Sequence, residues 1–148
     1  MDSMNIIDGV TITPLKIIKH PKGDVFHGMK KSDMGYSGFG EAYFSTISPD
    51  AIKPWKKHLE MTLNLIVPFG TIKFVVFDDR PQSPTHGQYN EFVISRKNYM
   101  RLTIPPNLWV AFMGLGNDVN MVLNIADLEH DPGEVIRSDF DQMPYEWG

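Results

Sequence analysis

Hydrophobic positions along this chain occur in short runs separated by turn-forming residues, and no long stretch has helical periodicity. Aromatic and β-branched residues recur in seven runs, preceded by a weakly alternating segment at residues 10–19. The seven runs are residues 40–47, 52–67, 71–78, 89–94, 101–104, 108–114 and 120–125. This pattern is typical of sandwiches and barrels. It predicts an all-β fold with enough strands to close a small barrel or jelly roll.

Turn signals and composition support the same segmentation. Proline, glycine, serine and aspartate break the pattern at residues 48–50, 68–70, 79–81, 83–87 and 105–107, which implies hairpins. Because 148 residues with 42% hydrophobic content can build one core, we expect a single domain over residues 1–148. We expect residues 1–22 to form an N-terminal arm or strand, and the acidic residues 129–148 to wrap the barrel as loops with one short helix.

Charge and residue usage exclude several classes of function. A net charge of −4 disfavours a general nucleic-acid binder, because neutralising phosphates requires clustered cations. The absence of cysteine excludes disulfides and thiolate metal ligands. No apolar run approaches the roughly 18 residues of a membrane helix, and the N-terminus lacks a basic segment followed by an apolar one. We therefore expect a cytoplasmic protein that binds neither nucleic acid nor membrane.

The most informative segment for chemistry is residues 52–62, where basic residues cluster in an acidic chain. In a strand, Lys56 and His58 share one face, whereas Lys53 and Lys57 share the other. Inside a barrel mouth such side chains would be partly desolvated, which lowers the pKa of each and favours a proton-accepting form. They can also bind an anion. The alternative is a solvated basic face on an edge strand.

Residues 52–70 resemble the first cupin motif, and residues 102–112 resemble the second. In metal-binding cupins the first motif supplies two histidines, spaced H-x-H, and a glutamate, and the second supplies a third histidine. The corresponding residues here are Lys56, His58, Thr62 and Val110. One imidazole cannot hold a metal alone, since catalytic sites normally keep about three protein ligands. We therefore predict no metal.

Among metal-independent cupins, residues 23–148 resemble the dTDP-4-dehydrorhamnose 3,5-epimerase family. Residues 77–80 and 83–87 resemble its D-x-R and S-P-T-x-G motifs, residues 104–106 its I-P-x-G motif, and Glu134 its acidic turn near the end of the chain. The resemblance implies a cupin, or double-stranded β-helix jelly-roll barrel, that forms a homodimer. It further implies binding of a nucleotide-linked 4-keto sugar and removal of protons next to the ketone, with no cofactor.

The family typically pairs a histidine with an aspartate as the base and uses a tyrosine as the acid. The resemblance places Lys56 at the histidine position, Asp139 at the aspartate position and Leu123 at or near the tyrosine position. Lys56 beside Asp139 is either a base or, because a paired carboxylate raises the pKa of a lysine, a charged group that polarises the ketone or binds phosphate. His58 is then the preferred base, since histidine titrates nearest neutrality. Tyr43 is the tyrosine placed to replace the acid.

Five further residues are candidates for substrate binding. Glu41 shares a strand face with Tyr43 and faces either the sugar pocket or solvent. Asn64 and Asn124 interrupt apolar runs and either line the pocket or pair with nearby backbone, because an unpaired buried amide costs roughly 1–3 kcal/mol. The last two are Lys53, a cation suited to a diphosphate, and Phe26, which resembles the family segment that covers the partner subunit's nucleotide.

Other residues have structural alternatives. Arg80 is expected to pair with Asp78 or Asp79 rather than with substrate. Trp55 and Trp109 either pack in the core or stack on a nucleotide base.

Two functions follow from these observations. The first is an isomerase or epimerase that acts on a nucleotide-activated 4-keto-6-deoxy sugar in the synthesis of a bacterial surface polysaccharide, such as O-antigen or capsule. The second is a catalytically inactive, sugar-nucleotide-binding cupin that serves as an accessory protein of the pathway. Lys56 and Leu123 favour the second, whereas His58 and the polar strand faces favour the first.

Overall fold

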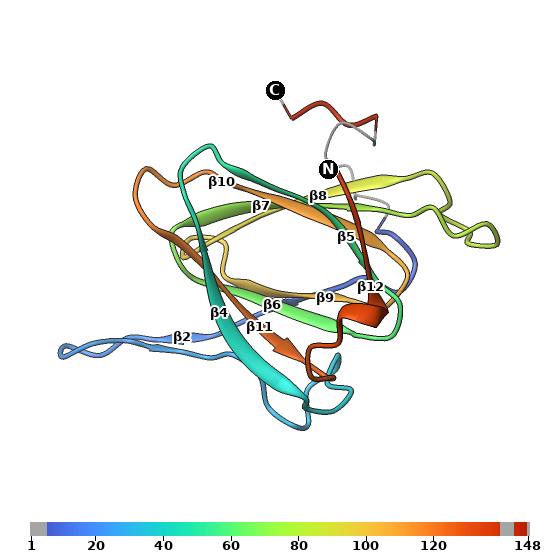
Figure 1. The fold of residues 1–148 in the computed structure, drawn as a ribbon. Coiled ribbons are helices and arrows are strands. Elements are labelled where there is room, and N and C mark those ends of the chain that lie inside the picture. The colour runs from blue at the N-terminus through green and yellow to red at the C-terminus, as the bar shows by residue number, and fades with distance from the viewer. Residues whose placement is uncertain (1–5, 140–143, 148) are drawn as a thin grey trace.

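The computed structural model describes residues 6–139 and 144–147 of the chain, which contain twelve strands and one 3-10 helix (Figure 1). The strands are β1 Thr11–Pro14, β2 Ile17–Ile18, β3 Val25–Phe26, β4 Glu41–Ile47, β5 Ile52–His58, β6 Leu63–Phe69, β7 Thr71–Phe77, β8 Tyr89–Ser95, β9 Met100–Ile104, β10 Trp109–Gly114, β11 Asn120–Ala126 and β12 Val135–Ser138. The 3-10 helix is η1, Pro132–Glu134. No helix in this part of the chain is long and apolar enough to cross a membrane.

Two five-stranded antiparallel sheets face each other and form a barrel (Figure 1). The strand order is β1-β9-β6-β11-β4 in the first sheet and β12-β5-β10-β7-β8 in the second. Strands β2 and β3 form a separate hairpin that projects from the barrel (Figure 1). The predicted all-β cupin jelly roll is therefore confirmed.

The predicted run 52–67 is not one strand, because the chain changes sheets within it. Strand β5 ends at His58 and pairs with β10, whereas β6 begins at Leu63 and pairs with β9 and β11. At the corner, the backbone N–H of Thr62 donates to Asp127 Oδ1 at 2.8 Å. The carboxylate of Asp127, which is distant in the sequence, thus replaces a strand hydrogen bond at this corner. The hydrophobic pattern of the sequence contains no sign of such a contact.

The C-terminal wrap contains a strand that was not predicted. Strand β12 pairs with β5, so β5 lies between two neighbours and is not the edge strand of the solvated-face alternative. The expected short helix is the single 3-10 turn η1, which is capped by Asp131 through a 3.0 Å hydrogen bond from Gly133 N.

Apolar side chains form two cores, one on each face of the second sheet. The main core fills the space between the sheets and includes Ile7 from the N-terminal segment. The second core lies on the outer face of β5, β10 and β7, where Trp55 and Trp109 pack with Tyr145 and Trp147 of the C-terminal segment. Trp109 Nε1 also donates to Asp79 Oδ2 at 2.9 Å. Both tryptophans are therefore core residues outside the barrel.

The turn between β7 and β8 is closed by a buried carboxylate. Asp78 accepts hydrogen bonds from Arg80 Nε at 2.9 Å, from Ser83 Oγ at 2.5 Å and from Thr85 Oγ1 at 2.6 Å. Arg80 Nη2 donates to the carbonyl of Asp8 at 2.8 Å and so ties in the N-terminal segment. The expected pairing of Arg80 with Asp78 is confirmed, and these motif residues stabilise the fold.

Candidate active site

One cavity between the two sheets contains most of the predicted chemistry. It has a volume of about 170 Å³ and is lined by Tyr43, Ser45, Lys53, Pro54, Lys56, His58, Leu63, Leu65, Val110, Phe112, Val122 and Asn124. These residues come from strands of both sheets. Among the described residues, no carboxylate lines this cavity directly.

A bulge in β5 brings Lys53 into the cavity together with Lys56 and His58. In the pairing of β10 with β5, Val110 lies opposite Lys56 and Phe112 lies opposite Lys53, so β5 has one extra residue in this interval. The extra residue breaks the alternation of faces. The prediction that Lys53 points away from Lys56 is therefore wrong. Lys57 does face outward as predicted, and its Nζ lies 2.7 Å from Asp79 Oδ1.

His58 is held by a buried carboxylate. Its Nδ1 lies 2.5 Å from Glu134 Oε1, and the other oxygen of Glu134 accepts from the backbone N–H groups of Glu60 and Met61, each at 3.1 Å. Burial raises the pKa of Glu134, but the hydrogen bonds from His58 and the two N–H groups outweigh it and hold the pKa below its ordinary value. An ionised Glu134 accepts the Nδ1 proton, which leaves Nε2 of His58 as the proton acceptor.

Sequence reasoning singled out Glu134 as part of a motif but did not connect it with His58. The two residues are separated by 76 positions, and no local pattern joins them. The C-terminal turn η1 carries Glu134 to the corner after β5, where the carboxylate meets both the imidazole and the backbone.

Lys56 is not paired with Asp139. Asp139 is exposed, follows the end of β12 and lies beside a separate outer hollow. The residue of β12 opposite Lys56 is Arg137. Desolvation lowers the pKa of Lys56, and repulsion from Arg137 and Lys53 lowers it further. This direction is the opposite of the one expected from a paired aspartate, because the neighbours of Lys56 are cations.

Tyr43 reaches the cavity from β4, in the sheet opposite His58. Its hydroxyl accepts a 3.1 Å hydrogen bond from Asn124 Nδ2, and Asn124 Oδ1 accepts from the backbone N–H of Asn64 at 3.2 Å. Leu123 lies on the other face of β11, beside an outer hollow. The position that resembles the family's acid is therefore outside the cavity, and Tyr43 is the tyrosine inside it.

Asn64 does not line the cavity. Its Nδ2 donates to the carbonyl of Gly35 at 3.1 Å, and its Oδ1 accepts from Thr103 Oγ1 at 2.6 Å. The two leucines that flank it, Leu63 and Leu65, point inward instead. Asn64 therefore pairs with backbone, which was the alternative to lining the pocket. Its partner, Gly35, belongs to the segment that covers the outer face of the sheet containing β6.

Glu41 and Phe26 also lie outside the lining of this cavity. Glu41 begins β4, opposite Ala126. Phe26 contacts Tyr99 edge to face, with ring centroids 5.4 Å apart, and the Arg96 guanidinium lies 4.7 Å from its ring. The hairpin that carries Phe26 is thus fixed to its own barrel at this end.

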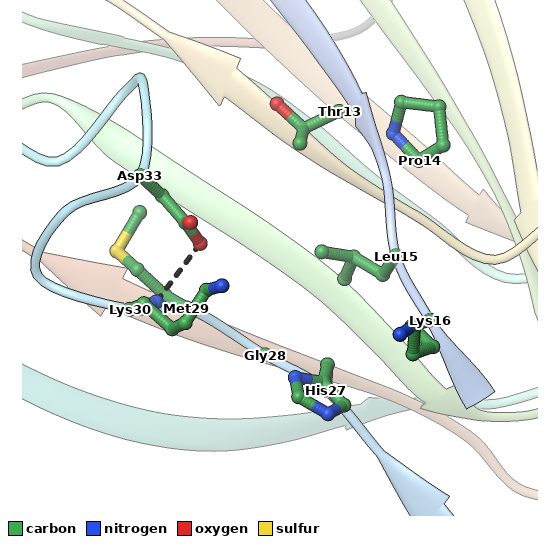
Figure 2. A pocket seen from close by; sticks show the side chains of 9 residues that line it. All are labelled: Thr13, Pro14, Leu15, Lys16, His27, Gly28, Met29, Lys30 and Asp33. Atoms are coloured by element: carbon green, nitrogen blue, oxygen red, sulfur yellow. Dashed lines mark hydrogen bonds between the residues drawn. The ribbon is translucent and has the colours of Figure 1, made fainter. Parts of the chain in front are cut away.

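A second hollow, with a volume of about 200 Å³, lies outside the barrel between β1 and the segment after β3 (Figure 2). Its basic residues are Lys16, His27 and Lys30, and the Asp33 carboxylate accepts the backbone N–H of Lys30 at 2.9 Å (Figure 2). Arg101 supports this wall, with Nη1 2.7 Å from the carbonyl of Gly28. No predicted site residue lines the hollow, so the barrel cavity is the candidate active site.

The neutral imidazole of His58 is expected to carry its proton on Nδ1, because Glu134 accepts there. Proton-detected ¹⁵N spectroscopy of the ring nitrogens measures this tautomer directly. Glu134→Gln should increase the population protonated on Nε2. The matched control is Glu60→Gln, because Glu60 contacts the pair only through its backbone. A wild-type ring protonated mainly on Nε2 would contradict the assignment.

Fold and site together define a cupin barrel whose cavity is lined by a tyrosine, two lysines and a histidine that is held by a buried glutamate. Within the described ranges, no group of three or more histidine, aspartate or glutamate side chains is arranged to hold a metal ion. The chain belongs to the dTDP-4-dehydrorhamnose 3,5-epimerase-like family of cupins.

Three comparisons support this assignment. The chain is 33% identical over 111 residues to the probable low-salt glycan biosynthesis epimerase Agl13 of Haloferax volcanii. The matched region covers 72% of this chain and 71% of that protein. It is 24% identical over 131 residues to the spore coat polysaccharide biosynthesis protein SpsL of Bacillus subtilis, covering 87% and 85% of the two chains. A crystal structure of a dTDP sugar isomerase from Desulfovibrio desulfuricans G20 superposes with a TM-score of 0.92 and 35% identity, covering 95% and 92%. No family model matches the sequence.

Proposed function

We propose that this protein is a sugar-nucleotide epimerase or isomerase of glycan biosynthesis, and that its substrate is a nucleotide-activated 4-keto-6-deoxy sugar. The names of the Haloferax and Desulfovibrio relatives support the reaction class. The observation that carries the proposal is the His58–Glu134 pair, which presents a proton acceptor to a cavity that Tyr43 enters from the opposite sheet.

His58 is the base in this proposal. It removes a proton from a carbon next to the ketone, and the electron pair of the C–H bond moves toward the ketone oxygen. Glu134 holds the imidazole in the required tautomer and stabilises the imidazolium that forms. Cationic side chains beside the cavity, Lys53 and Arg137, stabilise the negative charge of the diphosphate and of the reacting oxygen.

Tyr43 is the acid, and its position decides the outcome of the reaction. Protonation of the same carbon from the opposite face gives the epimer. Where the neighbouring carbon carries a hydroxyl group, protonation of the former ketone carbon and transfer of the hydroxyl proton to the former ketone oxygen give the ketone isomer. Neither route as written requires a metal or an organic cofactor, because each step transfers only a proton and an electron pair within the substrate.

The proposal extends to the setting of the reaction. The pathway is the synthesis of a surface polysaccharide, O-antigen or capsule, in the cytoplasm, and the name of the Bacillus relative supports a polysaccharide pathway. The protein acts as a homodimer in which the β2–β3 hairpin reaches the partner. Ile18 and Val25 of this hairpin are 45% and 53% exposed, which favours contact with a second chain.

Deuterium incorporation tests the proposal. In heavy water, the wild-type protein should place deuterium from solvent at a carbon next to the ketone of dTDP-4-keto-6-deoxyglucose, and NMR and mass spectrometry locate the label. Tyr43→Phe should keep this exchange within about threefold of wild type but lower epimer formation about 100-fold, because only the acid of the opposite wall is removed. Equal loss of exchange and of epimer in Tyr43→Phe would contradict the assigned role.

The accessory-protein hypothesis has one structural observation in its favour. Leu123, at or near the position where the resemblance places the family's tyrosine, lies outside the cavity. Under this hypothesis the protein binds the sugar nucleotide but incorporates no deuterium. Binding without exchange across dTDP- and UDP-linked 4-keto sugars would therefore replace the enzyme proposal with the accessory one.

A further inference from the structure

Lys56 lies at the mouth of the candidate active site with cations as its charged neighbours. Lys53 shares the cavity wall, and Arg137 lies opposite Lys56 in the adjacent strand β12. His58, on the same wall, points its Nδ1 toward Glu134 rather than toward Lys56. No ion pair of Lys56 occurs among residues 6–139 and 144–147. Two carboxylates at the corner after β5 are engaged elsewhere, Glu134 with His58 and the backbone and Asp127 with the backbone N–H of Thr62.

This environment makes the ammonium form of Lys56 less favourable than in a free lysine. Desolvation and two neighbouring cations disfavour the ammonium form, which is the reason that the pKa of Lys56 is lowered. A lysine beside a second cationic group is an established arrangement for an amine that attacks a carbonyl carbon. Lys56 is also exposed to solvent, so a ketone can approach it and water can enter and leave.

We propose that Lys56 is a covalent catalyst that forms an imine with the ketone carbon of the bound sugar. This inference rests on the proposed function and names a chemical step for the same site. An iminium ion withdraws electrons from the adjacent carbon more strongly than a neutral ketone does, so proton removal by His58 becomes easier. The primary amine of Lys56 would thereby have a role that the imidazole of His58 cannot fill.

The step balances with one proton from solvent, which is returned when the imine is hydrolysed. The Lys56 amine adds to the ketone carbon, and its proton moves to the oxygen to give a carbinolamine. The hydroxyl group takes up a proton from solvent as the C–O bond breaks, so water leaves and a protonated imine remains. His58 removes the adjacent proton, and the electron pair of the C–H bond forms a C=C bond as the iminium becomes an enamine. Reprotonation and addition of water reverse these steps and release the ketone, so no oxidation state changes overall.

The spacing along β5 suits this division of roles. Two residues along one face of a strand place their Cα atoms about 7 Å apart, and both side chains line the same cavity. Lys56 can thus hold the ketone carbon while His58 reaches the carbon next to it. Tyr43 enters from the opposite sheet and meets the other face of the sugar.

Reductive trapping tests the inference. The wild-type protein is incubated with dTDP-4-keto-6-deoxyglucose and sodium cyanoborohydride, which reduces an imine to a stable secondary amine. Peptide mass spectrometry then locates the adduct, and deuterium exchange is measured in parallel. We expect the adduct on Lys56. In the matched control Lys57→Met the adduct should remain, because Lys57 belongs to the same strand but pairs with Asp79 outside the cavity.

Lys56→Arg separates covalent from purely electrostatic action, because arginine keeps the positive charge but forms no imine. We expect Lys56→Arg and Lys56→Met to lower deuterium exchange to the same extent, by about 100-fold or more. If Lys56→Arg retains exchange within about threefold of wild type, the lysine acts through charge and the imine is overturned.

The outcomes also distinguish this inference from the proposed function. Exchange without an adduct on Lys56 overturns the imine and leaves the epimerase or isomerase proposal in place. An adduct on Lys56 without exchange supports the imine and contradicts the proton-transfer proposal. Absence of both overturns the two together, and presence of both supports the two together.

Discussion

His58→Gln is expected to lower deuterium exchange into the 4-keto sugar by about 1,000-fold, because glutamine has no group that accepts a proton near neutral pH. The amide can still donate to Glu134, which keeps the two N–H groups of the corner paired. The loss should therefore appear in the exchange rate and not in the thermal unfolding temperature. Isotope exchange followed by NMR, together with calorimetry of the same preparation, measures both quantities.

The control for this substitution is His130→Gln. His130 is an exposed residue in the segment before η1 and lies outside the lining of the cavity. Its exchange rate should equal that of the wild type. If His58→Gln exchanges within about threefold of wild type while His130→Gln is unchanged, another group is the base, and the assignment of His58 is wrong.

Asp78→Ala is expected to lower the free energy of unfolding by about 3 kcal/mol, because it removes the acceptor that closes the β7–β8 turn and leaves a partly buried cation without its partner. Asp78 is 0% exposed and accepts from the Arg80 guanidinium and two hydroxyl groups. Urea unfolding followed by tryptophan fluorescence measures the change.

The neighbouring residue provides a matched control. Asp79 is one position along the chain, but it is 36% exposed and pairs with Lys57 and Trp109 on the outer face of the sheet. Asp79→Ala should cost about 1 kcal/mol or less. Equal losses for Asp78→Ala and Asp79→Ala would show that burial of the Asp78 network adds nothing to stability.

Acid should remove the contribution of Asp78. Burial raises the pKa of Asp78, but the hydrogen bonds from Arg80, Ser83 and Thr85 outweigh it and hold the pKa far below its ordinary value of about 3.8. A group whose pKa is depressed in the folded state stabilises the protein above its unfolded pKa, and this stabilisation is lost as the pH falls toward the folded value. The free energy of unfolding should therefore fall more steeply below about pH 4 in the wild type than in Asp78→Ala.

Strand positions and turn positions in this protein are local properties, which explains why the sequence pattern predicted them well. The runs 71–78, 89–94 and 108–114 correspond closely to β7, β8 and β10. The two unpredicted pieces, β3 and β12, are short, and each is a strand only because of the partner it meets. The break between β5 and β6 was missed because both sides of the corner have strand-like composition.

The direction of each side chain was less predictable, since a single extra residue in a strand reverses the alternation. The bulge in β5 turns Lys53 into the cavity. In the pairing of β11 with β6, Asn124 lies opposite Leu65 and not opposite Asn64, so two asparagines that look alike in the sequence face opposite sides of the sheet. Asn124 lines the cavity, whereas Asn64 pairs with Gly35 on the outer face. No feature of either apolar run distinguishes the two in advance.

The sequence by itself determined an all-β cupin barrel with a cluster of basic residues on one of its strands, because motif order and strand patterning are properties of neighbouring residues. Only the tertiary structure decided the partners of the cavity residues. It joined His58 to Glu134 rather than placing Asp139 beside Lys56, and it surrounded Lys56 with cations. The protonation state of these groups depends on charges and burial contributed by distant segments, so the chemistry of the site follows from the folded barrel.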